Sequence, residues 1–568
     1  MTVRIGRHEV AELRLDTAGA MTHDAVQTPW LEVTDPLGIT RRLPAFRTSD
    51  RAVTARYASG VEGSHGYRWL AADGNELRDG PVGHIVVLGS STASAPLHHG
   101  PVRISASGRS FEHEDGTPFL WLGDTWWHAL TPRISDEELS TLAAQRVEQG
   151  FTLVQLVVGP LPEVREFEPR GETVGGFSWE TGWSRIRPAF FDAADRRVRI
   201  LLDAGLVPCI VGAWGYHLDD AGIDVMKAHW HELVARYAAY PVIWVIAGEA
   251  SLPWYDQLFL PETPSHAARL AAGWAEVARS TRKLDPFGRP MTVHPSPGVD
   301  AYASLDVFPD TTLTDYQMLQ TGHWDRGSLP TTMATVSRIR AAVPGQPVLN
   351  GEVCYEGIMG ASWPDVQRFL WWAQVLAGAA GHTYGAQGLW GMNDGSFVGQ
   401  VGSWGGATWQ EAAALPGAAH VGAARRWLSE RPWTDMEPAN ERIVPGASWG
   451  SWLRPYAARC TNGRLICYLP SAAMLDNGAS DPRSYREVTL RGFQPGAAVH
   501  LSYVEPRSMT TSLEERHLAD ASGDIVLRRN MLAAMPSMED WVVEAVPEAG
   551  STADRAADAD RAQAPLMG

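Results

Sequence analysis

Glu249 and Glu352 end two apolar segments of the sequence, and their type and position suit them to chemistry. Glu249 follows the run Val242-Ile-Trp-Val-Ile-Ala247, and Glu352 follows Pro347-Val-Leu-Asn350. Such runs are typical of strands buried on both faces, so we expect poor access to water to raise the pKa of Glu249. Two carboxylates about 5 to 5.5 Å apart can carry out a double displacement at a sugar: one protonates the leaving oxygen, and the other attacks the anomeric carbon. A salt bridge between either glutamate and an arginine of the core is the alternative.

A third acid, Glu356, lies four residues after Glu352 in the motif Glu352-Val-Cys-Tyr-Glu356 and is the rival nucleophile. Its offset places it in the loop beyond the strand. We therefore expect Glu352 to be the attacking carboxylate.

Other polar and aromatic residues lie at or near the ends of the remaining apolar segments. The candidates for substrate contacts are Asp124, Trp126, His128, Gln155, Trp214, His294, Tyr316, His382, Tyr384 and Trp390. The sixth segment carries Tyr316 together with Asp315 and His323. We expect the Tyr316 hydroxyl to donate a hydrogen bond to the nucleophile, which would keep that carboxylate oriented and ionised.

Most of these candidates also have a structural interpretation. Asp124 and His128 would either bind substrate hydroxyls or, for Asp124, cap the following turn. The two later histidines would either contact the substrate or be satisfied within the core. The three tryptophans would either stack on the apolar face of a sugar ring or pack at the rim of the fold.

A (β/α)8 barrel would bring these residues together, because side chains at the carboxyl ends of its strands meet at one mouth. From residue 119 onward, strand-like apolar segments alternate with helical ones. The predicted strands cover 119–123, 151–158, 206–213, 242–247, 290–294, a weaker segment ending near 316, 348–351 and 381–384. The predicted helices cover 135–150, opened by a capping box at Ser135-Asp-Glu-Glu138, and 188–204, 224–240, 266–283, 331–342 and 364–379. An open doubly wound sheet is the alternative, but no glycine-rich phosphate loop follows any strand.

The flanks of this region have a different pattern. Residues 1–100 and 431–548 contain short extended segments separated by turn residues, so we predict a β-sandwich on each side of a barrel at 101–430. The tail at 549–568 is rich in Ala, Asp and Arg and is predicted to be disordered.

Composition excludes several classes of partner. Lys and Arg number 48 against 65 Asp and Glu, and a net charge of −17 repels phosphate backbones and anionic lipids. No apolar stretch is long enough to span a membrane and the amino terminus lacks a signal sequence, so we expect a cytoplasmic protein. The four cysteines form no CxxC pair, and His229-Trp-His231 lies within a predicted helix, so we expect no metal and no cofactor. The sequence leaves a homo-oligomer open.

Four stretches of the sequence resemble the apiosidase-like glycoside hydrolases. They are Gly100-Pro-Val-Arg-Ile104, Phe111-Glu-His-Glu-Asp-Gly-Thr-Pro-Phe-Leu-Trp-Leu-Gly-Asp-Thr-Trp126, Val242-Ile-Trp-Val-Ile-Ala-Gly-Glu249 and Pro347-Val-Leu-Asn-Gly-Glu-Val-Cys-Tyr-Glu356. The resemblance covers about residues 100 to 430. It implies a barrel between an amino-terminal sandwich and a collagen-binding-like domain. It also implies retaining chemistry, with Glu249 as acid/base and Glu352 as nucleophile.

The chain departs from this family at the fourth strand. Many relatives have Gly-Gly-Asp where this chain has Ala247-Gly-Glu249, so the sugar need not be apiose. Larger retaining barrels tend to place Asn before the acid/base, where this chain has Gly248. We expect an exo-acting enzyme that removes a terminal sugar, a furanose such as apiose or arabinose, from a plant-derived glycoside or oligosaccharide. A non-catalytic carbohydrate-binding protein on the same barrel is the alternative.

Overall fold

The computed structural model describes residues 2–17, 28–77, 80–89, 95–397, 399, 404–445, 452–471, 487–528 and 539–548. The predicted disordered tail at 549–568 lies outside these residues. The chain divides into two compact units: Met1–His323 with Ile339–Gly360 and His382–Leu415, and Trp324–Arg338 with Ala361–Gly381 and Pro416–Gly568. The domain boundaries expected near residues 100, 430 and 548 stay predictions.

Eight parallel strands form the central sheet in the order β16-β15-β14-β13-β12-β19-β18-β17. They are β12 (Trp121–Thr125), β13 (Leu153–Val157), β14 (Val207–Val211), β15 (Ile243–Val245), β16 (Met291–Thr292), β17 (Gln317–Gln320), β18 (Val348–Glu352) and β19 (Gly381–Tyr384). This is the strand order of a (β/α)8 barrel opened between its fifth and sixth strands. The predicted barrel is therefore confirmed, and with it the common mouth for the strand ends.

Side chains close the seam between β16 and β17. Ser304, on the short helix α7 (Ser304–Val307), donates its hydroxyl to the Val293 carbonyl at 2.7 Å and accepts from the Met318 amide at 3.0 Å. Thr292 bonds to Ser304 at 2.9 Å and donates to the Tyr316 carbonyl at 2.8 Å. These contacts fix the sixth strand against the fifth.

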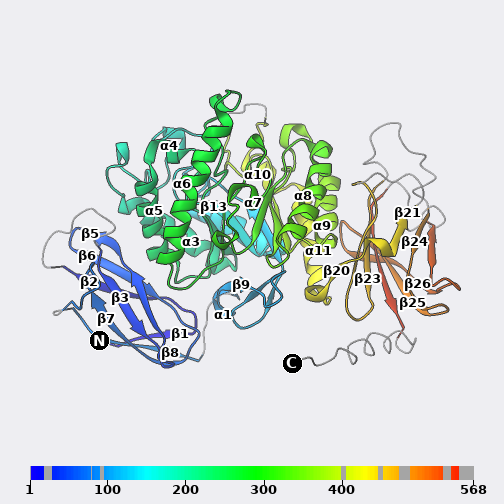
Figure 1. Cartoon of the computed structure of the whole chain (residues 1–568), viewed down its shortest axis with the longest axis horizontal. Coiled ribbons are helices and arrows are strands. Elements are labelled where there is room, and N and C mark those ends of the chain that lie inside the picture. Colours follow the sequence, from blue (N-terminus) through cyan, green and yellow to red (C-terminus); the bar gives the residue numbers. More distant parts are fainter. Residues whose placement is uncertain are drawn as a thin grey trace. The chain divides into compact units, whose positions relative to one another are not determined.

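Helices follow the strands along the chain, and Figure 1 shows α3, α5 and α6 covering the outside of the sheet in the first unit. The long helices are α2 (Asp136–Gln149), α3 (Pro188–Ala204), α5 (Ile223–Tyr237), α6 (Thr263–Leu284), α8 (Leu329–Ala342), α9 (Pro364–Leu376) and α11 (Pro416–Ser429), with shorter α4 (His217–Ala221) and α10 (Trp409–Ala413). The capping box predicted at α2 is present, with Ser135 as N-cap, Glu138 reaching back to it and Gly150 ending the helix at φ 100°.

The amino-terminal part of the first unit consists of two sheets packed around a common apolar core. The first contains β1 (Thr2–Gly6), β8 (Gly83–Leu88), β7 (Gly63–Leu70), β3 (Trp30–Thr34) and β4 (Thr40–Pro44); the second contains β2 (Ala11–Asp16), β6 (Ala52–Tyr57) and β5 (Phe46–Ser49). Helix α1 (Ala95–His98) and a small sheet of β9 (Val102–Ile104), β10 (Phe111–His113) and β11 (Pro118–Phe119) lead into the barrel. Buried and exposed residues alternate along β2, as expected for a sheet with one face in the core.

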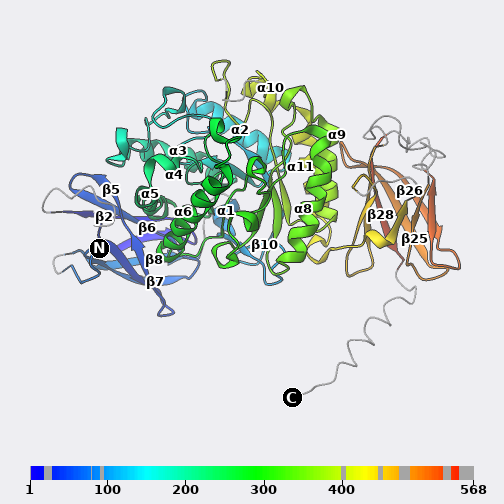
Figure 2. The same ribbon diagram turned by 45° about the horizontal axis from the view of Figure 1, so that its top comes forward.

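The carboxy-terminal part of the second unit also contains two sheets around a core of its own. One is β20 (Glu437–Pro438), β22 (Tyr456–Arg459), β23 (Leu465–Leu469), β28 (Trp541–Pro547), β25 (Ala498–Glu505) and β26 (Thr510–Leu518); the other is β21 (Ile443–Pro445), β24 (Glu487–Leu490) and β27 (Ile525–Arg528). Figure 2 shows β25, β26 and β28 side by side. Sheets thus flank the barrel on both sides along the chain, as predicted.

Among the residues that the structure describes, no helix is both long and apolar enough to cross a membrane.

Candidate active site

Glu249 lies just beyond β15, at the carboxyl end of the fourth barrel strand. Its backbone is in the left-handed region at φ 47°, which is uncommon for a residue other than glycine and is found at functional sites. Three donors hold its carboxyl group: Trp214 Nε1 at 3.2 Å from Oε2, Ser296 Oγ at 3.2 Å from Oε1 and Gln320 Nε2 at 3.0 Å from Oε1. The side chain is therefore fixed, although it is partly exposed at the mouth.

Gly248 explains why this chain lacks a polar residue before Glu249. A Cβ atom at position 248 would lie 2.2 Å from two carbons of the Trp214 indole, so any side chain there would displace the ring. The ring's Nε1 is one of the donors to Glu249. Glycine is thus needed for Trp214 to lie over the acid.

Glu352 ends β18, the seventh barrel strand, and is only 5% exposed. His323 Nε2 lies 2.8 Å from Oε1 and His294 Nε2 lies 3.2 Å from Oε2. Gln320 Nε2 donates to Oε1 at 3.0 Å, and the Tyr355 hydroxyl is also hydrogen-bonded to this carboxylate. Donors from the ends of the fifth and sixth strands and from the loop after the seventh therefore surround it.

The two carboxylates share one donor, the amide nitrogen of Gln320. It lies 3.0 Å from Oε1 of each, so these oxygens can be no farther apart than the two contacts laid end to end, about 6 Å. The trigonal geometry of an amide NH2 group brings the separation to roughly 5 Å. Carboxyl groups about 5 to 5.5 Å apart are typical of retaining glycosidases, whereas inverting enzymes need about 6.5 to 9.5 Å.

The surroundings push the two acids apart in pKa. Burial, followed by the charge of Glu352, raises the pKa of Glu249 to about 7. Burial also raises the pKa of Glu352, but hydrogen bonds from His294 and His323 and their charges outweigh it and lower that pKa to about 2. Near neutral pH, Glu249 can hold a proton while Glu352 is ionised. These are the protonation states that a general acid and a nucleophile need.

Aromatic rings enclose the pair on one side. Trp127 donates its Nε1 to the Tyr355 hydroxyl at 3.0 Å, and its ring packs edge-on against Trp214 at 5.4 Å and His294 at 5.7 Å between centroids. The expected residues Trp214 and His294 thus lie beside the two glutamates. Gln155, also expected here, lies on β13 and donates to the Gly351 carbonyl of β18 at 2.8 Å.

Three candidates on the first strand point away from the mouth. Asp124 is fully buried and accepts from Arg146 at 2.7 Å and from Trp126 Nε1 at 2.9 Å, so both side chains face helix α2. His128 is buried, with Nδ1 at 2.7 Å from Arg133 and Nε2 at 3.1 Å from the Pro162 carbonyl. The expectation that these residues contact substrate is wrong, because each is used in internal contacts.

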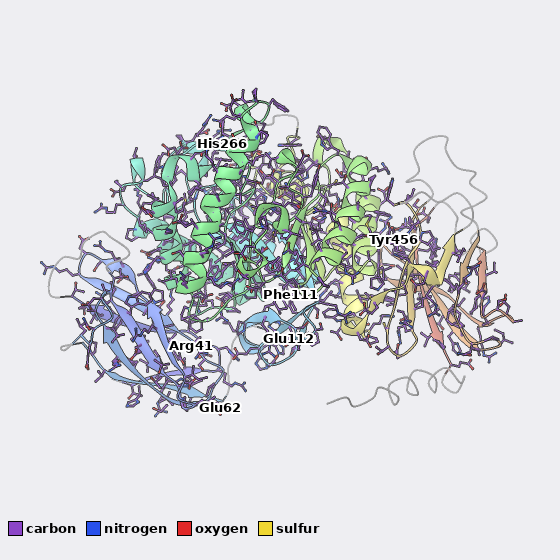
Figure 3. The ribbon with its side chains drawn as sticks, in the orientation of Figure 1. Arg41, Glu62, Phe111, Glu112, His266 and Tyr456 are labelled. Carbon is purple, nitrogen blue, oxygen red and sulfur yellow. The ribbon has the colours of Figure 1, made fainter. Side chains whose placement is uncertain are left out.

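Tyr316 does not reach the nucleophile. It precedes β17 rather than following it, and its ring packs against Phe111 at 5.5 Å and Trp121 at 5.7 Å, at the amino-terminal end of the barrel strands. Phe111 is labelled on the small sheet in Figure 3. The predicted hydrogen bond is therefore wrong for Tyr316, and Tyr355 occupies that role.

On the eighth strand, His382 and Tyr384 face outward. Thr383 accepts a hydrogen bond from Trp121 Nε1 at 3.0 Å, so its two neighbours lie on the other face of the strand. Burial lowers the pKa of His382 to about 3, which leaves the ring neutral. Tyr384 donates to Glu356 at 2.5 Å, so the rival nucleophile is held on this outer face, and neither strand-eight residue takes the substrate contact expected of it.

Trp390 lines a cavity beyond the eighth strand. The cavity has a volume of about 150 Å³, and its walls include Gln387, Trp390, Phe397 and Trp404. The ring of Trp404 lies 5.8 Å from that of His323, which contacts Glu352. The expected role of Trp390 as a stacking platform stays a prediction.

Four residues of the site are absent from the predicted contacts: Trp127, Ser296, Gln320 and Tyr355. Strand alternation could have indicated Trp127, because it lies two residues beyond Thr125, which faces the barrel interior. Tyr355 and Ser296 are in loops, where the sequence carries no equivalent signal. Within the described ranges, no group of three or more His, Cys, Asp or Glu side chains could hold a metal ion.

The known proteins to which this chain is similar are described as glycoside hydrolases or as apiosidase-like. The model of the family described as "Apiosidase-like, catalytic domain" matches residues 105–435, and no curated protein matches the chain. A solved structure described as a glycoside hydrolase is 21% identical, with a TM-score of 0.64 over 80% of this chain and 98% of that one. A family 5 glycoside hydrolase from Bacteroides vulgatus is 21% identical, with a TM-score of 0.63 over 80% and 95%. A putative glycoside hydrolase from the same organism is 15% identical, with a TM-score of 0.66 over 96% and 100%. At these identities the likeness to solved structures shows the shared fold.

Proposed function

The chain belongs to the apiosidase-like family of glycoside hydrolases, and from that membership we propose that it is a retaining, exo-acting enzyme with Glu249 as acid/base and Glu352 as nucleophile. Its substrate would be a plant-derived glycoside or oligosaccharide that ends in a furanose such as apiose or arabinose. The family supports the choice of sugar, and the site supports the reaction.

In the first step, an oxygen of Glu352 attacks the anomeric carbon while Glu249 gives its proton to the glycosidic oxygen. The bond to the leaving group breaks, and a covalent glycosyl-enzyme forms. In the second step, Glu249, now ionised, takes a proton from water, and the water oxygen attacks the anomeric carbon. The bond to Glu352 breaks, and both residues return to their starting states with retained configuration.

The observation that carries this proposal is the single amide of Gln320 bonded to both carboxylates. It limits the distance between them to the range in which one acid can attack while the other protonates. A protein that only bound sugar would have no need for two acids whose pKa values are shifted in opposite directions.

A panel of 4-nitrophenyl glycosides that includes furanosides tests the proposal. We expect release of nitrophenol from at least one furanoside, and NMR of the first-formed sugar should show the anomeric configuration of the substrate. Initial formation of the opposite anomer would contradict double displacement. Sugar binding without turnover of any substrate would favour the non-catalytic alternative.

The pH dependence of kcat/KM should show a limb set by Glu249. Its pKa is raised to about 7, so the proton that the leaving group needs is lost as the pH rises through that value. We expect kcat/KM to fall about tenfold per pH unit above it. The pKa of Glu352 is lowered, so that group stays ionised through the neutral range.

The matched control for this profile is Glu249→Gln, assayed on an activated aryl glycoside that needs little protonation. The alkaline limb should disappear in this variant. A limb that persists unchanged would assign the titration to another group.

A further inference from the structure

Another acid, Glu163, lies beyond the carboxyl end of the second barrel strand. It occupies the turn after β13, has φ 61° and is 6% exposed. A proline followed by a residue with positive φ is the arrangement of a type II turn, in which glycine is usual at the second of these positions. A glutamate there strains the backbone, and residues held in this way cluster at ligand-binding sites.

The turn that carries Glu163 is fixed by its neighbours. Four of its backbone carbonyls accept hydrogen bonds: Pro160 from the Trp214 amide at 3.0 Å, Leu161 from His217 at 2.9 Å, Pro162 from His128 at 3.1 Å and Val164 from Tyr216 at 3.1 Å. His128 therefore supports this turn instead of contacting substrate. These contacts hold the backbone of the turn in place on both sides of Glu163.

The carboxylate shares its surroundings with the catalytic acid. The Tyr255 hydroxyl is hydrogen-bonded to Glu163. Burial, and after it the charges of Glu163 and Glu249, raise the pKa of both Tyr255 and Tyr216. The two tyrosine rings lie 6.1 Å apart. Glu163 and Glu249 therefore both lie near this pair of tyrosines.

Glu163 also lies against a residue that lines the cavity beside Trp390. A Cβ atom at Gly399, which lines this cavity, would lie 3.1 Å from Glu163 Oε2 and 3.6 Å from the edge of the Trp390 ring. Trp404, which also lines this cavity, packs against His323, the partner of Glu352. The walls of the cavity thus contact Glu163 through Gly399 and His323 through Trp404.

Gln387 and Asn393 are the polar side chains among the described residues that line the cavity, apart from tryptophan, and both make internal hydrogen bonds. Gln387 donates to the Gly405 carbonyl at 2.9 Å and accepts from Trp390 Nε1 at 3.1 Å. Asn393 donates to the Ala407 carbonyl at 2.7 Å and accepts from the Gly395 amide at 2.9 Å. A ligand in this cavity would meet aromatic walls and the carboxylate at its edge.

We propose that Glu163 is a specificity-determining residue whose carboxylate, held by Tyr255, binds adjacent hydroxyls of a sugar ring that lies in the cavity against Trp390. The inference rests on the proposed function and names the part of the site that selects the sugar. A carboxylate offers two oxygens as acceptors and forms strong bonds with hydroxyl donors, while the apolar face of a sugar packs on tryptophan. Glu163 would bind substrate without exchanging protons or forming bonds to it.

Glu163→Gln tests this role with a 4-nitrophenyl glycoside that the wild-type chain cleaves. Loss of a charged hydrogen bond should raise KM roughly 10- to 100-fold. We expect kcat within about threefold of wild type and an unchanged alkaline limb, because Glu249 is untouched. Glu172→Gln is the matched control: it removes the same charge from an exposed glutamate of the same loop and should leave KM unchanged.

Oligosaccharide substrates identify the sugar unit that Glu163 contacts. A raised KM on the simple nitrophenyl monoglycoside supports contact with the terminal sugar, and a rise confined to oligosaccharides supports contact with the next unit. Unchanged KM values on both would overturn the proposal. So would equal losses in KM and kcat together with a lower Tm, which would indicate a structural role. Should Glu163→Gln not fold, Tyr255→Phe is the second variant. It keeps the carboxylate but removes the hydroxyl that is hydrogen-bonded to it, and it should raise KM roughly three- to tenfold.

A binding measurement separates this inference from the proposed function. Tryptophan fluorescence titrated with D-apiose and with L-arabinose gives Kd without turnover. Weaker binding by Glu163→Gln than by wild type supports the inference even if no glycoside is cleaved. Equal binding by both chains, or no binding of either sugar by wild type, overturns it.

Discussion

Glu352→Gln is expected to lower kcat by roughly 10⁴- to 10⁶-fold, the scale on which loss of a nucleophile acts. The amide cannot attack the anomeric carbon, but it keeps the size of the side chain and can still accept from His323 and Gln320. The fold and the binding of substrate should therefore survive. Stopped and continuous assays of nitrophenol release give kcat, and circular dichroism checks the fold.

The matched control for this experiment is Glu356→Gln. Its side chain lies on the outer face of the barrel, where Tyr384 donates to it, and a glutamine oxygen can accept the same bond. We expect kcat to stay within about tenfold of wild type, with a loss of stability at most. The reverse result, an active Glu352→Gln variant and an inactive Glu356→Gln variant, would assign the role of nucleophile to Glu356.

Glu249→Gln should affect substrates according to their leaving group. Protonation by a positioned acid contributes about 10²- to 10⁴-fold, so we expect a loss of this size for glycosides with alkyl or sugar leaving groups. A dinitrophenyl glycoside leaves without a proton and should lose less than about tenfold in its first step. A plot of log kcat/KM against leaving-group pKa measures the difference.

A matched control for the acid is Glu262→Gln, an exposed glutamate in the same connection after β15. It should leave the leaving-group dependence as in wild type. Equal losses on good and poor leaving groups in Glu249→Gln would count against its role as the acid.

The sequence predicted the helices, and the positions of the two glutamates at strand ends, because these signals are local. The capping box at Ser135 and Glu138 and the glycine at 150 determine the ends of α2 without reference to the rest of the chain. Glu249 and Glu352 each follow an apolar run, and a barrel places every such strand end at one mouth. Neither inference needs the orientation of a strand about its own axis.

Orientation is where prediction failed, because alternate residues of a strand face opposite sides and a shift of one residue exchanges all of them. The first-strand candidates Asp124, Trp126 and His128 are two positions apart and so fall on the same face of the extended chain. The side chain that reaches the site is Trp127, on the other face. On the eighth strand the candidates flank Thr383, the residue that faces inward. Barrel strands are apolar on both faces, so composition does not reveal which face is inner.

Tyr316 was misplaced for a different reason. The sixth strand, Gln317–Gln320, has a glutamine at each end and little apolar character, so the sequence indicated a strand that ends near residue 316 when it begins just beyond it. That shift hid Gln320, whose amide joins the two acids. Tyr355 and Glu163 lie in loops, and their positions depend on contacts between distant segments that no local pattern encodes.

Trapping of the glycosyl-enzyme tests the central claim most directly. The wild-type chain would be incubated with an activated fluoro-sugar matched to the glycoside that it cleaves, then digested and analysed by tandem mass spectrometry. We predict a mass increase of one fluoro-sugar on the peptide that carries Glu352, with fragment ions that place it on that side chain. Complete hydrolysis of the matched substrate without any adduct, or an adduct on Glu356, would contradict the account.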